Sequence, residues 1–90
     1  MIERWQLTLA GRVQGVALRY HTWLYARKNN LGGWIKNQDN GSVILEIEGE
    51  ATKLKDFVER IKLNPGWSRI DHLEIEIVSV LKEKKFKIHY

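Results

Sequence analysis

The chain contains no cysteine and no long apolar run. The lack of cysteine excludes a disulfide scaffold, a thiol nucleophile and thiolate metal sites, so packing alone must stabilise the fold. No apolar stretch approaches the ~20 residues that a membrane-spanning helix needs, and the first residues lack the basic start and apolar core of a signal peptide. We therefore expect a cytoplasmic protein without a membrane partner.

Neither charge nor length indicates a particular partner or a second domain. The net charge of +4 favours anionic partners, but nine of the fifteen cations are lysines spread along most of the chain. Ninety residues are too few for two independent cores, whereas 43% hydrophobic residues and four tryptophans are enough for one. The sequence predicts a single domain over residues 1–90.

Apolar and polar side chains alternate in several segments, which is typical of strands with one buried face. The first example runs from Trp5 to Leu9. Similar patterns and turn signals predict strands near residues 5–9, 34–37, 43–47, 73–77 and 86–90. We expect Asn40 and Gly41 to supply the positive φ angles of a tight hairpin turn, and residues 82–85 to form the last turn.

Two other segments repeat apolar residues at helical spacing. The first spans residues 16–28 and is closed by Asn29 and Asn30. The second carries one apolar stripe and ends before Asn64; its members are Leu54, Phe57, Val58 and Ile61. The order βαββαβ plus a final strand predicts an α+β fold of the split-βαβ or ferredoxin-like type, with a mostly antiparallel sheet and both helices on one face.

The segment from Gly11 to Val16 joins the first strand to the first helix. A glycine-containing loop at such a junction can direct backbone N–H groups inward beside the positive end of the helix dipole, which is a site for an anion. The alternative is that Gly11 and Gly15 only allow a tight turn. Arg19 falls in the first helical turn, where its guanidinium could hold two phosphate oxygens or be a solvated surface cation.

These residues resemble a known family. The run from Leu9 to Arg19 is similar to the first signature of the acylphosphatases, and the run from Gly33 to Asn37, followed by Gly41, Val43 and Gly49, is similar to the second. Both signatures occur in order and at the family's spacing, and the resemblance extends over essentially the whole chain. It implies the ferredoxin-like fold that the pattern of elements already predicts.

The resemblance also implies an activity, which is hydrolysis of an acyl phosphate to a carboxylate and inorganic phosphate. Arg19 then matches the phosphate-binding arginine and Asn37 the asparagine that positions water. The positions that match the phosphate-binding set are Arg12, Val13, Gln14, Gly15, Val16 and Arg19. We expect a monomeric enzyme with a small-molecule substrate, without a metal or cofactor and without a nucleic-acid partner.

This chemistry requires few catalytic groups. The leaving carboxylate has a conjugate acid of pKa ~4, so no strong general acid is needed at neutral pH. Preorganised donors and an in-line water are sufficient for the transition state. Asn37 can orient that water without acting as a base; alternatively, it is a strand-end residue that bonds the nearby hairpin.

Three positions depart from the family pattern: Leu18 replaces an aromatic residue, Ile35 replaces a smaller one, and Asn30 stands where glycine often ends the helix. Asparagine tolerates the left-handed conformation of helix ends, so Asn30 is expected to terminate the helix normally. Leu18 changes the packing directly before Arg19, which can displace the guanidinium and lower the rate. We also consider a contact between the carboxylate of Tyr90 and Arg19.

Other groupings of polar residues give weaker indications. The three histidines, His21, His72 and His89, lie far apart in the sequence, which speaks against a metal site. Glu46 and Glu48, like Glu74 and Glu76, share strand faces and are expected on a solvated sheet face rather than in acid–base catalysis. The basic run of residues 82–85 is expected to be a solvated turn.

Two binding functions remain as alternatives to an enzyme. Open βαββαβ sheets also bind RNA, but residues 43–48 carry glutamates where stacking rings and a cation are expected. The second alternative is a phosphate-ligand module with little or no turnover, resembling those attached to carbamoyl-transfer proteins. An assay on a simple acyl phosphate would separate turnover from binding.

Overall fold

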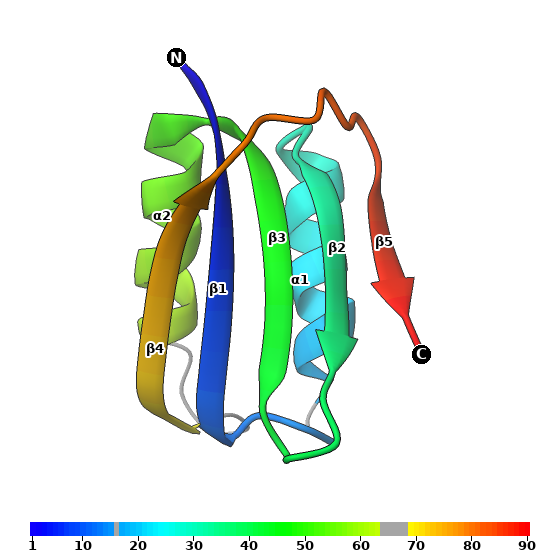
Figure 1. The fold of residues 1–90 in the computed structure, drawn as a ribbon, viewed down its shortest axis with the longest axis vertical. Helices are drawn as coiled ribbons and strands as arrows, with labels where there is room; N and C mark the ends of the chain where they lie inside the picture. Colours follow the sequence, from blue (N-terminus) through cyan, green and yellow to red (C-terminus); the bar gives the residue numbers. More distant parts are fainter. Residues whose placement is uncertain (16, 64–68) are drawn as a thin grey trace.

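A computed structural model describes residues 1–15, 17–63 and 69–90. Figure 1 shows one sheet with both helices behind it. In chain order the elements are β1 (Ile2–Arg12), α1 (Leu18–Lys28), β2 (Gly32–Asn37), β3 (Val43–Glu50), α2 (Ala51–Lys62), β4 (Arg69–Val78) and β5 (Phe86–His89). The predicted ferredoxin-like fold with an additional C-terminal strand is confirmed.

The five strands lie in the order β4-β1-β3-β2-β5. β1 is antiparallel to β3, and β3 is antiparallel to β2, so β1 and β2 run in the same direction with β3 between them. β5 pairs with β2 in parallel. As a result, the ends of β1, β2 and β5 and the start of α1 all meet at the same end of the sheet, which is the lower end in Figure 1.

The core lies between the sheet and the two helices. Alternate residues of β1 and β3, such as Leu7 and Leu45, are fully buried against this layer. All four residues of the predicted apolar stripe on α2 are buried, as expected. α1 contributes Leu18 and Ala26 to the same core. The buried Leu18 therefore packs the first turn of α1 against the end of the sheet where β1, β2 and β5 finish.

α1 begins two residues later than its apolar spacing suggested. Ala17 adopts the left-handed conformation, with φ 62°, and Leu18 is the first helical residue. At the other end, Asn30 has φ 56°, and the N–H of Leu31 donates to the carbonyl of Ala26. This is the hydrogen bond of a Schellman ending, so the prediction that Asn30 terminates the helix in place of glycine is confirmed.

The hairpin between β2 and β3 differs from the prediction. Gly41 has a positive φ of 92°, but Asn40 does not. The connection spans residues 38–42 and is stabilised by the Asn40 side chain, whose Oδ1 accepts a hydrogen bond from the Ser42 N–H over 3.0 Å. Asn40 therefore contributes a side-chain acceptor rather than a left-handed backbone.

The connection between the last two strands is not a turn. β5 lies at the opposite sheet edge from β4, so residues 79–85 cross the face that the helices leave open (Figure 1). This strap, as we call residues 79–85, also changes the expected environment of two acidic residues. Glu48 is buried and Glu46 nearly so, whereas Glu74 and Glu76 are exposed as expected.

Candidate functional site

A small hollow opens at the sheet end where β1, β2 and β5 finish. Its volume is about 180 Å³, which is below the ~300 Å³ at which pockets for drug-sized ligands begin. The residues that line it are Val13, Gly15, Ala17, Leu18, Arg19, Tyr20, Asn37, Ile88 and Tyr90. The hollow therefore suits a small group, with the remainder of a ligand outside it.

Arg19 supplies the positive charge of this hollow. It is the second residue of α1, so helix geometry holds its backbone close to Ala17, the residue that precedes the helix. Its Nη1 donates to the carbonyl of His89 over 3.2 Å, and its guanidinium carbon lies 5.0 Å from the centre of the Tyr90 ring. Among the described residues no carboxylate forms an ion pair with it, so its charge is available to an anion.

Arg19 has a fixed orientation because two different groups contact it. A guanidinium has five N–H donors in one plane. The His89 carbonyl occupies one of them and the Tyr90 ring contacts the guanidinium. Since the His89 carbonyl accepts from Nη1 alone, the remaining donors can form a bidentate contact with a phosphate or carboxylate.

The first turn of α1 adds backbone donors to the site. It contains no acidic residue, and no side chain caps it, so N–H groups at the positive end of the helix dipole are not used by a capping side chain. Gly15 precedes this turn with φ 71°, and a Cβ there would meet nothing within 4 Å. Glycine accepts this φ without strain, and the loop leaves open space in front of it.

Asn37 approaches the hollow from β2. It is the last residue of that strand and is only partly exposed. Its Oδ1 is buried and has no hydrogen-bond partner among the described residues. A buried acceptor without a donor costs about 1–3 kcal/mol, so this oxygen is suited to accept a hydrogen bond from a molecule that enters the hollow.

The predicted site residues fall into three groups. Val13, Gly15, Arg19 and Asn37 meet at the hollow. Arg12 is exposed at the end of β1 and does not line the hollow, while Val16 lies outside the described residues. The Gln14 amide points to the β2–β3 hairpin instead, where its Nε2 donates over 2.8 Å to the carbonyls of Gln38 and Ser42.

Gly11 has a different role from the one that its place in the loop suggested. It belongs to β1, where the register with β4 shifts between Ala10 and Gly11. A Cβ at Gly11 would overlap the carbonyl oxygen of Arg69. The glycine therefore permits two backbones to approach closely at the sheet edge, and the cradle itself begins at Val13.

Sequence reasoning missed several residues that line the hollow. Ala17 and Tyr20 line it from the start of α1, and Ile88 reaches it because β5 runs parallel to β2 at the sheet edge. No local pattern indicates that pairing. The expected contact at the end of the chain is present in another form, since Arg19 meets the His89 carbonyl and the Tyr90 ring. Leu18 lies beneath this arrangement and is almost fully buried.

Other kinds of site receive no support from the described residues. Residues 1–15, 17–63 and 69–90 contain no group of three His, Cys, Asp or Glu side chains that could hold a metal ion. On the exposed β4, the Nε2 of His72 instead lies 3.0 Å from the Oε1 of Glu74. Neither helix in this part of the chain has the length and apolar character that crossing a membrane requires.

Comparison with known proteins gives a consistent result over the full chain. The family model described as Acylphosphatase matches residues 5–88. An acylphosphatase of Clostridium beijerinckii is 41% identical over 88 residues, which are 97% of this chain and 98% of the relative. An acylphosphatase of Bacillus subtilis is 35% identical and covers 97% of both chains.

Solved structures show the same similarity in three dimensions. The crystal structure of acylphosphatase from Bacillus subtilis matches with a TM-score of 0.91 and 34% identity, covering all of both chains. Full-length HypF in its phosphate- and nucleotide-bound form matches with a TM-score of 0.92 and 35% identity. In that case all of this chain is covered but only 12% of HypF.

Proposed function

Because this chain belongs to the acylphosphatase family, we propose that the hollow formed by Val13, Gly15 and Ala17, the start of α1 and the end of β2 is its active site. The protein is an acylphosphatase, a hydrolase that converts a small-molecule acyl phosphate to a carboxylate and inorganic phosphate. The observation that carries the assignment of the site is the meeting of Arg19 and Asn37 at one small hollow.

Arg19 and the loop bind the phosphoryl group in this proposal. The guanidinium keeps several N–H donors after its bond to the His89 carbonyl, and these match two phosphoryl oxygens. Backbone N–H groups at the start of α1 add donors at the positive end of the helix dipole. Together they stabilise the charge that spreads over the equatorial oxygens in the transition state.

Asn37 positions the nucleophile. The buried Oδ1 accepts a hydrogen bond from a water molecule and directs its oxygen toward phosphorus. The water oxygen forms a bond to phosphorus while the bond from phosphorus to the acyl oxygen breaks, and the electron pair leaves on the carboxylate. Both protons of the attacking water go to the phosphate product, which can release one of them to solvent, so no side-chain base is required.

Substitution of Arg19 tests this assignment. In the whole chain, Arg19→Ala should lower kcat/KM for acetyl phosphate by about 10³ and weaken inhibition by inorganic phosphate, because the main charged donor is lost. Arg19→Lys keeps the charge without the planar fork and should recover only part of the activity. A matched control is Arg27→Ala, which removes a cation from the far end of the same helix. Unchanged turnover in Arg19→Ala would disprove the proposed site.

The proposal extends to the state in which the enzyme acts. Every group invoked above comes from one chain, so a monomer is sufficient for catalysis. We propose no nucleic-acid partner, because the open sheet face carries Glu46 and Glu48, both bound to Arg4. The cytoplasmic location expected from the sequence stays a prediction.

A further inference from the structure

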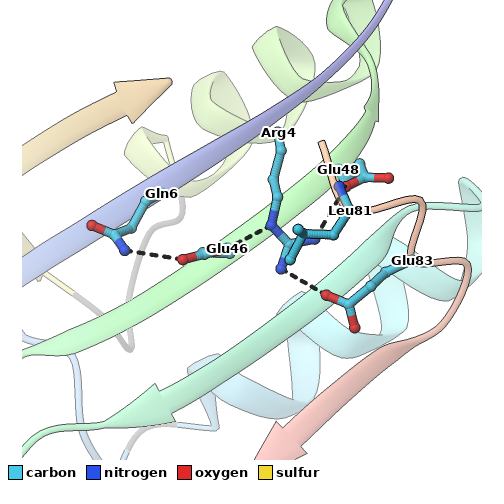
Figure 2. Close-up of polar contacts among 6 residues, drawn as sticks. All are labelled: Arg4, Gln6, Glu46, Glu48, Leu81 and Glu83. Atoms are coloured by element: carbon cyan, nitrogen blue, oxygen red, sulfur yellow. Dashed lines mark hydrogen bonds and ion pairs between the residues drawn. The ribbon is translucent and has the colours of Figure 1, made fainter. Parts of the chain in front are cut away.

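A buried arginine lies on the open sheet face, well away from the hollow. Arg4 of β1 is 1% exposed and contacts three carboxylates. Its Nε donates to Glu46 over 2.6 Å, its Nη1 to Glu48 over 3.1 Å and its Nη2 to Glu83 over 2.7 Å (Figure 2). Glu46 and Glu48 belong to β3, whereas Glu83 belongs to the strap.

The strap is attached to this cluster at two points. Besides the Arg4–Glu83 ion pair, the backbone N–H of Leu81 donates to Glu48 over 2.8 Å (Figure 2). Lys82 lies between the two attachments with φ 60°, a left-handed conformation that strains a residue with a side chain. Such strain persists only where neighbouring contacts enforce it, so the strap follows a path imposed by its anchors.

The length of the strap leaves it little slack. From β4 to β5 the chain crosses four inter-strand spacings of ~4.8 Å, or roughly 19 Å. Seven residues in the strap reach at most roughly 25 Å when fully extended. Only Lys84 and Lys85 separate Glu83 from β5, and the Lys85 carbonyl already accepts a hydrogen bond from Gly33. Fixing Glu83 therefore fixes where β5 begins.

β5 carries this restraint to the catalytic arginine. The strand has four residues, pairs with β2 alone and ends at His89. The His89 carbonyl and the following Tyr90 ring are the two groups that contact the Arg19 guanidinium. Parallel pairing is slightly less stable per residue than antiparallel pairing, so this short edge strand is positioned by the buried Phe86 at its start and by the strap together.

We propose that Arg4 and Glu83 are positioning residues for catalysis, which hold the strap and, through β5, keep Arg19 oriented toward the phosphoryl group. This inference rests on the proposed role of Arg19. Release of Glu83 lets β5 shift along β2, and a displacement of about 1 Å in a catalytic group can cost up to 10²-fold in rate. Glu83 contacts Arg4 and not Arg19, so it acts on Arg19 only through the strap and β5.

The test compares Glu83→Ala with Glu46→Ala in the whole chain. Each variant removes one carboxylate from Arg4 at nearly equal distance, 2.7 and 2.6 Å, but only Glu83 attaches the strap. We expect Glu83→Ala to raise the KM for acetyl phosphate and the inhibition constant of phosphate about tenfold. Glu46→Ala should change both less than twofold, and Glu83→Gln, which keeps an acceptor for Arg4, should restore most of the loss.

A direct readout of Arg19 separates this inference from the proposed function. The NMR signal of the Arg19 Nε–H should shift in Glu83→Ala and stay in place in Glu46→Ala, whether or not Arg19 is essential for turnover. Thermal unfolding of both variants is measured in parallel, so that a general loss of stability is recognised. Equal changes of KM and of the Arg19 signal in the two variants would overturn the proposal, as would an unmoved signal in Glu83→Ala.

Discussion

Asn37 carries a buried polar atom that points to a role in catalysis. Its Oδ1 is buried and has no protein donor among the described residues, whereas most buried acceptors in folded proteins are satisfied. We predict that Asn37→Ala lowers kcat about 10²-fold or more, because water is no longer held in line. The inhibition constant of inorganic phosphate should stay within about twofold, since Arg19 and the loop bind the phosphoryl group.

Steady-state kinetics with phosphate as a competitive inhibitor check this prediction. Ser42→Ala serves as a control, because it removes a buried hydroxyl from the adjacent hairpin without altering the hollow. Asn37→Ala and Arg19→Ala should then show different patterns, with a kcat effect in the first and a binding effect added in the second. Equal losses of turnover and phosphate binding in Asn37→Ala would contradict its role.

At the residue scale, the sequence indicates those site residues that lie in short recognisable motifs. Arg19 and Asn37 lie in two recognisable motifs, and the structure brings both to the hollow. Ile88 could not be placed there from spacing, because its position depends on a parallel strand pairing far away in the sequence. Glu48 was expected in solvent for the same reason, since nothing near it in the chain indicates that Arg4 and the strap cover it.

At the element scale, the two helices are joined by a tyrosine near the end of α1. The hydroxyl of Tyr25 donates to Asp56 of α2 over 2.6 Å, and Arg60 donates to the same carboxylate over 2.9 Å. Burial and the bond to Asp56 raise the pKa of Tyr25 to about 12 from 10.0. The bonds from Tyr25 and Arg60 hold the pKa of Asp56 below its ordinary value of 3.8.

The raised pKa of Tyr25 predicts a loss of stability in alkali. The folded state holds this proton more tightly than the unfolded state, so the stabilisation is fully present below pH 10 and is lost as the pH rises toward about 12. Replacing Tyr25 by Phe should remove this loss. Unfolding free energies of both proteins, measured by denaturant titration from pH 8 to 12, should therefore converge above pH 10.

Phenolate absorbance offers an independent check on the same group. The chain has three tyrosines, and the phenolate absorbance that develops near pH 12 in the folded protein should be reduced in the Tyr25→Phe variant. An unchanged titration curve in that variant at high pH would show that Tyr25 is not the shifted group.

Because Asp56 has a lowered pKa, its part of the stabilisation is present above pH 3.8 and is lost as the pH falls below that value.

The elements themselves were predictable to different degrees. The apolar stripe of α2 and the alternation in β1 and β3 report directly on the buried faces, and these elements were found. The alternation in β4 predicted the strand correctly, but its apolar residues Ile75 and Ile77 are exposed. The start of α1 was placed too early because Ala17 takes a left-handed conformation, which apolar spacing does not reveal. The strap was mistaken for a turn because only the order of strands in the sheet shows how far it must travel.

At the scale of the whole molecule, Arg4 joins three parts of the chain that are distant in sequence. It lies on β1 and binds two carboxylates of β3 and one of the strap. Burial would lower the pKa of this guanidinium, but its hydrogen bonds to Glu46, Glu83 and Glu48 outweigh that effect and raise the pKa. Arg4 therefore stays charged and compensates acidic groups that the strap partly removes from water.

Arg4→Met should be among the most destabilising substitutions in the chain. It leaves Glu48, which is 4% exposed, buried without a cation, and breaking a buried ion pair in this way typically costs about 3–5 kcal/mol. For a domain of marginal stability this is a large share of the total. The double variant Arg4→Met with Glu48→Met should recover much of the loss, because the unpaired charge is removed as well.

Arg60→Met provides the contrast. Its ion pair with Asp56 is equally short at 2.9 Å, but both side chains are more than half exposed, and such pairs contribute only about 0–1 kcal/mol. Denaturant titrations of the three variants compare the cases directly. A loss in Arg4→Met no larger than that in Arg60→Met would mean that the cluster under the strap does not join these strands.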